Sequence, residues 1–336
     1  MAVAELTAQE QDILARKPRS LWRDSFRRLT QNRVAMAGGV FIILLIFMAL
    51  AAPLLAPFDF ATQDLILNNA VPEYLLWMMP EGAENYATLS DKFPLGADDL
   101  GRDLLSRTIY GARVSLTVAV VAATVSLVVG MIYGTISGYV GGRIDNLMMR
   151  VVDFLYGFPF LIVVILLQTY FKAMARRGAE GGFASILLDL NASMGGMLFL
   201  FIAIGLVNWI GMSRIARGQV LSYKEKEFVE ASKSVGSGHG RIIFRHLVPN
   251  IIGPLIVYET LAIPGYIFTE AFLSFIGLGV DPPTPSWGIM ISEAVQGIRS
   301  YPNQILVPAI ALSLTTLAFN FLGDGLRDAF DPRMAD

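Results

Sequence analysis

The feature that most constrains this chain is a series of apolar stretches, each close to the length that crosses a bilayer. A helix needs about 20 mostly apolar residues to cross the hydrocarbon core of a membrane. Six stretches qualify, although the fourth is short: residues 34–56, 112–138, 151–171, 197–213, 251–273 and 305–322. Because backbone polar groups in lipid must be satisfied internally, these stretches predict an all-α integral membrane protein with six transmembrane helices.

The composition agrees with a membrane protein and excludes several kinds of chemistry. The 336 residues are 54% hydrophobic and 16% charged, whereas about 25% of the residues in soluble domains are charged. The chain has no cysteine, so disulfides, thiolate metal sites and cysteine nucleophiles are excluded. Its two histidines, His239 and His246, leave little for a metal site, and the P-loop, HExxH and GxSxG motifs do not occur. We therefore expect no catalytic residue, no metal ligand and no directly bound cofactor.

The distribution of positive charge predicts the orientation. Lys and Arg accumulate on the cytoplasmic side of membrane proteins. With the N-terminus inside, 18 of the 26 Lys and Arg residues fall in the inner segments, which are 1–33, 139–150, 214–249 and 323–336. Both termini are therefore expected in the cytoplasm. One loop opposes the rule, because Lys172, Arg176 and Arg177 fall on the outside.

The expected spans divide the chain into regions. The polar tail 1–33 suits either an amphipathic helix on the inner leaflet or a simple topology signal. The first helix, 34–56, is interpreted as an uncleaved anchor. The remaining regions are an extracytoplasmic segment at 57–110, a core of five further helices at 111–322 that includes a cytoplasmic loop at 214–250, and a cytoplasmic tail at 323–336.

A stripe of small residues runs along the second span. Gly130, Gly134, Gly138 and Gly142 recur every four residues. In lipid, helices associate by close backbone contact, and small residues four apart permit it. The stripe predicts a tightly packed helix, and its target is equally well another span or a sister subunit.

Five acidic residues are candidates for function. A carboxylate inside a membrane indicates function by default, but we favour Glu270 at the outer interface and Glu259 facing protein or water. Asp98, Asp99 and Asp103 could together bind a cation, yet their spacing matches no calcium loop. Helix-start and surface roles are favoured for these three.

The cytoplasmic loop carries a helical pattern. The sequence SYKE, at residues 222–225, fits a capping box that would begin a helix. Phe228, Ala231 and Val235 then form a narrow apolar face, and Gly236 provides a C-terminal cap.

A second short helix is expected at 239–247, with Pro249 marking the return to the membrane. The product is a helix–turn–helix hairpin that suits either a knob for a soluble partner or a structural loop.

The same loop resembles the EAA–G–P motif of ABC importer permeases. Glu230 and Ala231 begin the motif, Gly236 follows Glu230 by six residues, and Pro249 follows it by nineteen. Ser232 departs from the motif, because it replaces the second alanine.

Three further stretches carry the resemblance along the chain. They are PLGADDLGRDLLSRTIYGARVSL (94–116), GGRIDNLMMRVVDFLYGFPF (141–160) and SFIGLGVDPPTPSWG (274–288). The chain therefore resembles the C-type permease subunits of dipeptide, oligopeptide and nickel ABC importers. Within that resemblance, the segment 172–196 looks longer than usual.

The resemblance implies a type I importer architecture with a cytoplasmic coupling helix in a bacterial or archaeal cell (inner) membrane. It implies a homologous permease subunit, two ATPase subunits that hold ATP and Mg²⁺, and an extracytoplasmic solute-binding protein as partners, with no nucleic acid. The residues expected to couple to the ATPase are Glu230, Ala231, Ser232, Gly236, Arg241 and Pro249. The expected solute is a peptide, with nickel or another solute as the alternative. A stand-alone secondary carrier and a membrane scaffold remain the competing classes.

Overall fold

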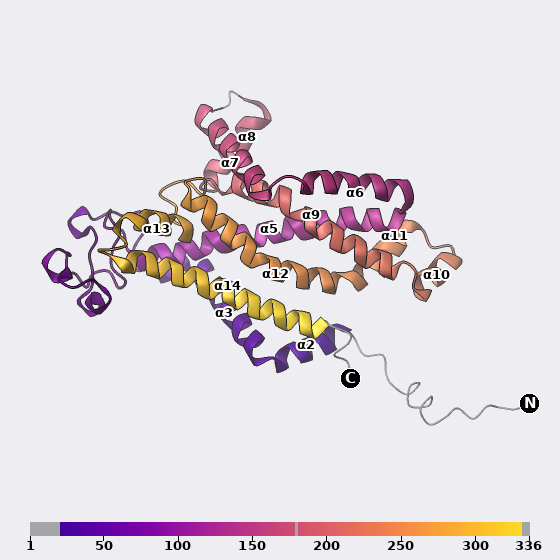
Figure 1. Ribbon diagram of the computed structural model, residues 1–336, viewed down its shortest axis with the longest axis horizontal. Helices are drawn as coiled ribbons and strands as arrows, with labels where there is room; N and C mark the ends of the chain where they lie inside the picture. The colour runs from indigo at the N-terminus through magenta and orange to yellow at the C-terminus, as the bar shows by residue number, and fades with distance from the viewer. Residues whose placement is uncertain (1–20, 179–180, 331–336) are drawn as a thin grey trace, which may run out of the picture.

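The computed structural model describes residues 21–178 and 181–330, and within these ranges the fold is built from helices joined by turns. Figure 1 shows an elongated bundle whose long helices run roughly along one axis. Five helices are long and apolar enough to span a membrane. They are α3 (Arg33–Leu50), α5 (Leu104–Val140), α9 (Met197–Tyr223), α12 (Val248–Phe275) with the short helices before it, and α14 (Pro302–Phe330).

A broken helix stands where the third span is expected. The stretch predicted at 151–171 is divided between α6 (Gly142–Tyr156) and α7 (Phe160–Arg177), which bend by 79°. The sixth span exists only if this bent pair counts as one. Pro159 is the physical reason, because the residue before a proline is disfavoured in helical conformation and α6 ends just upstream.

Shorter elements complete the described chain. They are α2 (Leu21–Gln31), α4 (Ala52–Leu55), η1 (Leu65–Leu67), η2 (Glu73–Met78), η3 (Ala83–Asn85), α8 (Gly182–Ser193), α10 (Glu227–Ser234), α11 (His239–Arg241), the π-helical turn η4 (Ile242–Leu247), α13 (Trp287–Ala294) and η5 (Val295–Gly297).

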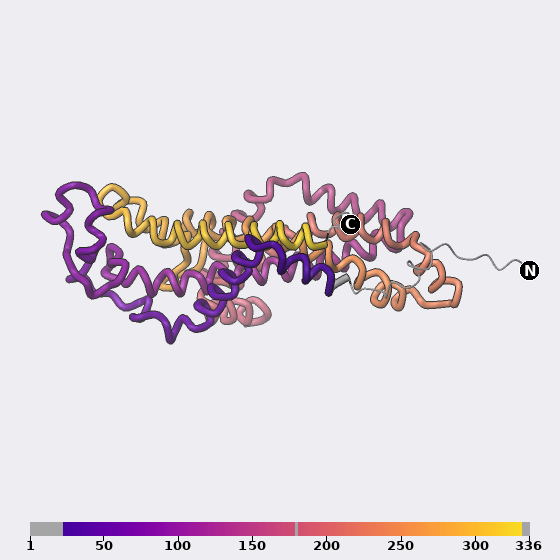
Figure 2. The backbone as a smooth tube through the Cα atoms, turned by 90° about the horizontal axis from the view of Figure 1, so that it is seen from below, coloured from indigo at the N-terminus to yellow at the C-terminus, as the bar shows by residue number. Residues whose placement is uncertain are grey.

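The two ends of the bundle differ. Figure 1 shows the loops of residues 57–103 and α13 at one end of the long axis, and α10 at the other. The pair α7 and α8 projects sideways from the bundle. In the perpendicular view of Figure 2, α14 runs alongside α2 and α3, which agrees with the contacts among these helices.

The glycine stripe of α5 packs on α9 of the same chain. A Cβ atom added to Gly134 would lie 2.2 Å from the carbonyl oxygen of Ser213, and one added to Gly130 would lie 2.5 Å from Cβ of Met212. A Cβ atom added to Gly138 would lie 3.0 Å from the carbonyl oxygen of Arg217, so this glycine also lies close to α9. Gly142 does not share this role, because α5 ends at Val140 and a Cβ on Gly142 would meet nothing within 4 Å.

Trp287 joins α13 to α5. Its side chain is fully buried, and its indole N–H donates a hydrogen bond of 3.1 Å to the carbonyl oxygen of Thr108. Gly111 permits this approach, since a Cβ there would lie 3.0 Å from the indole ring. Burial of the large ring with its polar atom satisfied fixes α13 against α5.

Candidate functional site

The loop that is predicted to face the cytoplasm folds into a compact hairpin, which we call the elbow (residues 224–247). It consists of α10, a turn, α11 and η4. Figure 1 shows α10 at the end of the bundle farthest from the 57–103 loops. The elbow therefore lies at one end of the bundle's long axis.

The start of α10 differs from the expectation. The predicted capping box at 222–225 does not form, because α9 continues to Tyr223 and holds Ser222 inside its last turn. Lys226 is instead the N-cap of α10, and its side chain makes no capping hydrogen bond. The strongly apolar α9 overrides a local capping signal.

The end of α10 is a Schellman turn, as the glycine predicts. Gly236 has φ +78°, in the left-handed region. Its N–H donates to the carbonyl oxygen of Lys233 at 2.9 Å, and the N–H of Ser237 donates to that of Ser232 at 3.1 Å. Both bonds satisfy carbonyl groups that the helix end would leave unpaired.

The second part of the elbow is continuous with α12. The segment α11 leads through the π-helical turn η4 into α12 without an interruption, and together they form one helix from His239 to Phe275. Pro249 lies inside this continuous helix, directly after η4, where its ring removes one backbone N–H donor. The expected boundary between a separate helix at 239–247 and the fifth span is therefore wrong.

The elbow is anchored through its inner side. Val229 is fully buried and belongs to an apolar cluster with Val220 of α9, Leu247 of η4 and Ile251 of α12. Ser232 is buried on the same side. These contacts hold α10 firmly against the ends of two spans.

The predicted apolar face of α10 points away from the chain. The side chain of Phe228 is 40% exposed and that of Val235 is 80% exposed, and Ala231 is exposed between them. We call these three residues the outer stripe. An apolar stripe on a helix that its own chain leaves uncovered is suited to contact with a partner.

The six predicted coupling residues do not lie on one face. Glu230 and Ala231 are exposed, as are Gly236, Arg241 and Pro249, whereas Ser232 is buried against the bundle. Within the described residues, the side chains of Glu230 and Arg241 form no ion pair. Five of the six are thus accessible and Ser232 has an internal position.

A polar clamp missed by the sequence analysis fastens α6 to α9 near the elbow. Arg217 donates to both carboxylate oxygens of Asp145 at 2.6 Å, and Ser137 donates to the same carboxylate. Lys224 reaches across to the carbonyl oxygen of Gly138 at 3.1 Å. The signal available in the sequence is an acidic residue directly after the end of the second span.

His239 also has a specific contact. Its Nδ1 lies 2.8 Å from the hydroxyl oxygen of Tyr139, near the end of α5. This hydrogen bond connects the start of α11 to a third span. The elbow is consequently held by α5, α9 and α12 together.

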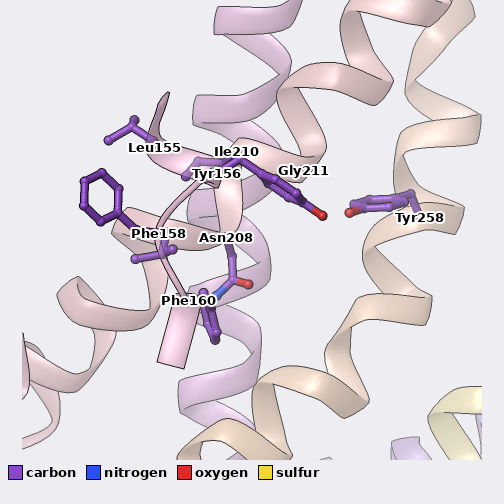
Figure 3. A pocket seen from close by; sticks show the side chains of 9 residues that line it. Leu155, Tyr156, Phe158, Phe160, Asn208, Ile210, Gly211 and Tyr258 are labelled. Atoms are coloured by element: carbon purple, nitrogen blue, oxygen red, sulfur yellow. The ribbon is translucent and has the colours of Figure 1, made fainter. Parts of the chain in front are cut away.

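A cavity of about 390 Å³ opens between the α6–α7 bend, α9 and α12. Figure 3 shows the aromatic side chains of Tyr156, Phe158 and Phe160 around it, with Asn208 from α9 and Tyr258 from α12. The hydroxyl groups of Tyr156 and Tyr258 point toward each other across it. The lining mixes aromatic faces with neutral hydrogen-bonding groups.

The end of the bundle formed by residues 57–103 and α13 contains a buried ionic network. Arg107 pairs with Asp98, and with Glu293 at 2.8 Å. Arg102 pairs with the same two carboxylates, at 2.6 Å from Asp98 and 3.0 Å from Glu293. Both arginine side chains and Asp98 are nearly fully buried. The network fixes the loop before α5 to α13.

The acidic trio therefore has three separate roles. Asp98 belongs to the network, and Asp103 is the N-cap of α5, where it accepts from the Ser106 N–H at 2.7 Å. Asp99 is largely exposed, with 62% of its side chain accessible. Partial desolvation, together with the charges of Asp98 and Glu293, raises the pKa of the Asp99 carboxyl. The described residues show no group of acidic or histidine side chains that could hold a metal ion.

The two intramembrane carboxyls lie inside the protein. Glu270 is fully buried and accepts hydrogen bonds of 2.7 Å from Ser115 and Ser274, five residues before the end of α12. Glu259 is also buried and accepts a hydrogen bond of 3.0 Å from Tyr266, which agrees with the expectation that it faces protein. Glu270 thus links α12 to α5, whereas the hydrogen bond of Glu259 lies within α12.

Two family models match the chain. The model described as binding-protein-dependent transport system inner membrane component matches residues 126–336. The model described as the N-terminal TM domain of oligopeptide transport permease C matches residues 20–72.

Curated relatives extend the similarity over nearly the whole chain. The oligopeptide transport system permease protein OppC of Bacillus subtilis is 38% identical over 98% of this chain and 96% of that protein. OppC of Escherichia coli K12 is 41% identical over 94% and 92%, and the dipeptide transport system permease protein DppC of Bacillus subtilis is 40% identical over 97% and 90%. A solved structure of the MetNI methionine ABC transporter, inward facing, matches 67% of this chain with a TM-score of 0.49 and 16% identity.

Proposed function

Because the chain belongs to the family of binding-protein-dependent transport system inner membrane components, we propose that it is a membrane-spanning permease subunit for peptide uptake. It is a multi-pass membrane protein of the all-α class. The observation that carries the peptide assignment is the similarity, over more than nine-tenths of the chain, to permeases named for oligopeptide and dipeptide transport.

The proposed complex contains four kinds of subunit. A homologous permease would complete the pathway, two ATPase subunits would bind ATP and Mg²⁺, and an extracytoplasmic protein would deliver the solute. This chain itself would be non-catalytic and would bind no cofactor directly. The presence of an uncovered outer stripe on α10 supports an ATPase partner at the elbow.

The orientation follows from the charges and the elbow. Both termini and the elbow would face the cytoplasm, while residues 57–103 and α13 would face the outside. Figure 1 shows α10 of the elbow at one end of the bundle and residues 57–103 with α13 at the other end, as this orientation requires.

Coupling would act through the anchored elbow. Closure of the ATPase dimer on ATP would press on the outer stripe, and the buried contact of Val229 with α9 and α12 would pass the displacement into the spans. A ligand shifts an equilibrium only by its differential affinity for the two states. ATP must therefore favour one arrangement of the spans by favouring one position of the elbow.

The cavity in Figure 3 would face the solute pathway. Tyr156, Tyr258 and Asn208 offer neutral hydrogen-bonding groups, and Phe158 and Phe160 offer apolar surface. Such a lining tolerates peptides of different sequence better than a site with fixed charges, because it imposes no single side-chain charge.

The test is reconstitution. The chain is co-expressed with its sister permease, ATPase and binding protein, purified as one complex, and placed in proteoliposomes. We expect uptake of a labelled tripeptide that requires ATP and the binding protein, with no competition by Ni²⁺. Ni²⁺ uptake would favour the nickel alternative, and gradient-driven uptake by the chain alone would show a secondary carrier.

A further inference from the structure

A second hollow, of about 270 Å³, lies where α7 meets the start of α9 and the loop between α12 and α13. It is separate from the cavity of Figure 3, and the two share no lining residue. Its polar lining consists of Gln168, Lys172 and Arg176 from α7, Asn191 from α8, and Asp281 from the loop after α12.

The unusual member of the lining is Gln168. Its side chain is fully buried, yet neither its amide nitrogen nor its amide oxygen has a hydrogen-bond partner among the described residues. A buried amide left unpaired costs free energy, and such groups call for an explanation. An unpaired donor beside an unpaired acceptor is the complement of a peptide group, which also presents one N–H and one C=O.

Charges of both signs stand beside this amide. Lys172 pairs with Asp281 at 3.0 Å, and Arg176 forms no ion pair within the described residues. Lys172, Arg176 and Asp281 together therefore carry an excess of positive charge. An unpaired guanidinium next to a hollow is suited to a carboxylate, which it binds with two parallel hydrogen bonds.

The walls of the hollow are fixed. The ring of Phe199 stacks on that of Phe171 with centroids 4.8 Å apart, and the buried side chain of Asn191 accepts from the Phe199 N–H at 3.2 Å. Gly196 leaves room for Asp281, since a Cβ there would lie 2.6 Å from the Asp281 carboxylate. Packing thus holds Phe199 and Asn191 in place beside the hollow.

We propose that this hollow binds the C-terminal end of a peptide, an inference that rests on the proposed function. The carboxylate pairs with Arg176, beside Lys172, and the last peptide group pairs with the amide of Gln168. This role also explains why Lys172 and Arg176 stand on the side of the molecule where positive charge is otherwise scarce.

The experiment measures binding without the solute-binding protein. The purified complex in nanodiscs is titrated with a fluorescent-labelled tripeptide that has a free C-terminus, and with the same peptide as its C-terminal amide. Three variants are compared with the unchanged chain: Gln168→Leu, Arg176→Gln and, as the matched control, Arg177→Gln. Arg177 lines the neighbouring hollow but not this one.

We expect amidation, Gln168→Leu and Arg176→Gln each to weaken binding about tenfold, since each removes a hydrogen bond or a charge that the peptide end would pair with. Arg177→Gln should bind as the unchanged chain does. Equal binding of the acid and the amide, or unchanged binding by both Gln168→Leu and Arg176→Gln, overturns the proposal. So does failure of the unchanged chain to bind, which would mean that water alone satisfies Gln168.

The proposal and the function on which it rests fail separately. If the complex imports tripeptides but the variants bind and transport normally, only the subsite is wrong. If the unchanged complex imports no peptide at all, the proposed function is wrong.

Discussion

Arg217 of α9 donates to both carboxylate oxygens of Asp145 in α6, with two hydrogen bonds of 2.6 Å. The carboxylate is 9% exposed and the guanidinium 32% exposed, so solvent screens the pair only partly. The pair holds the connection between α5 and α6 against the end of α9, within two helical turns of Tyr223, the last residue before the elbow.

The first prediction concerns this clamp. Asp145→Asn should lower the free energy of unfolding by about 1–3 kcal/mol, because the partly buried guanidinium of Arg217 loses a charged acceptor. Arg217→Lys should not restore the loss in full, because an ammonium cannot make both bonds in one plane. Thermal unfolding in detergent measures both. Arg143→Ala, at an exposed position of the same helix, is the control and should leave the melting temperature unchanged.

The second prediction concerns the helix interface. Gly134→Ala should destabilise the protein by about 1–3 kcal/mol, because overpacking forces α5 away from α9. Gly218→Ala on α9 is the matched control, since a Cβ there meets nothing within 4 Å. The yield of folded protein after heating distinguishes them. Equal loss in both variants would contradict the assignment of the stripe to this interface.

The third prediction concerns the elbow. Gly236→Val should abolish ATP-dependent uptake, because a β-branched residue at φ +78° is strained by about 1–2 kcal/mol or more and breaks the Schellman turn. Gly240→Val is the control, since Gly240 has open space around it and no positive φ. Both variants should still insert into the membrane.

Glu230→Lys tests the same surface by charge. It should reduce ATPase association in a pull-down without changing thermal stability, because the side chain is exposed and pairs with nothing in the described chain. Normal association and normal uptake in both Glu230→Lys and Gly236→Val would remove the coupling role from the elbow.

The fourth prediction is a pH dependence at the outer end. Burial and the neighbouring Asp98 and Glu293 raise the pKa of Asp99, so the folded state holds this proton more tightly than the unfolded state. Ionised Asp99 therefore costs stability, and the cost appears as pH rises above the ordinary value of 3.8.

Asp99→Asn should consequently raise the melting temperature at pH 7 and leave it unchanged near pH 3. The increase should be small, because most of the side chain is in solvent. Glu81→Gln, at an exposed position, should show no difference between the two pH values. A lower melting temperature for Asp99→Asn at pH 7 would show that its distant pairing with Arg102 outweighs the repulsion.

The features predicted from the sequence are those that depend on local pattern. The apolar stretches indicate the long helices, and a glycine after a short helical pattern indicates the turn at Gly236. The bend between α6 and α7 was not predicted, although Pro159 inside the third stretch is a local signal for it. In each case the deciding residues are neighbours in the chain.

The features that were missed depend on contacts between distant residues. Asp98 and Glu293 are almost two hundred residues apart, and only the fold brings both to Arg107. The inward position of Ser232 and the outward position of Ala231 depend on how α10 lies on the spans, which no helical period specifies alone. At Ser222 the error is of another kind. The sequence there matches a capping box, but α9 continues through it to Tyr223 and no helix begins at that point.

The unbroken helix from His239 to Phe275 has a mechanical consequence. At 1.5 Å per residue it is a rod of about 55 Å, with its near end in the elbow and its far end beside Glu270. A tilt of about 10° at a pivot near one end moves the other end by roughly 10 Å. Pro254 and Pro264 lie within the rod and set where it flexes. Under the proposed coupling, a small displacement at the elbow would therefore become a larger displacement at the far end of the rod.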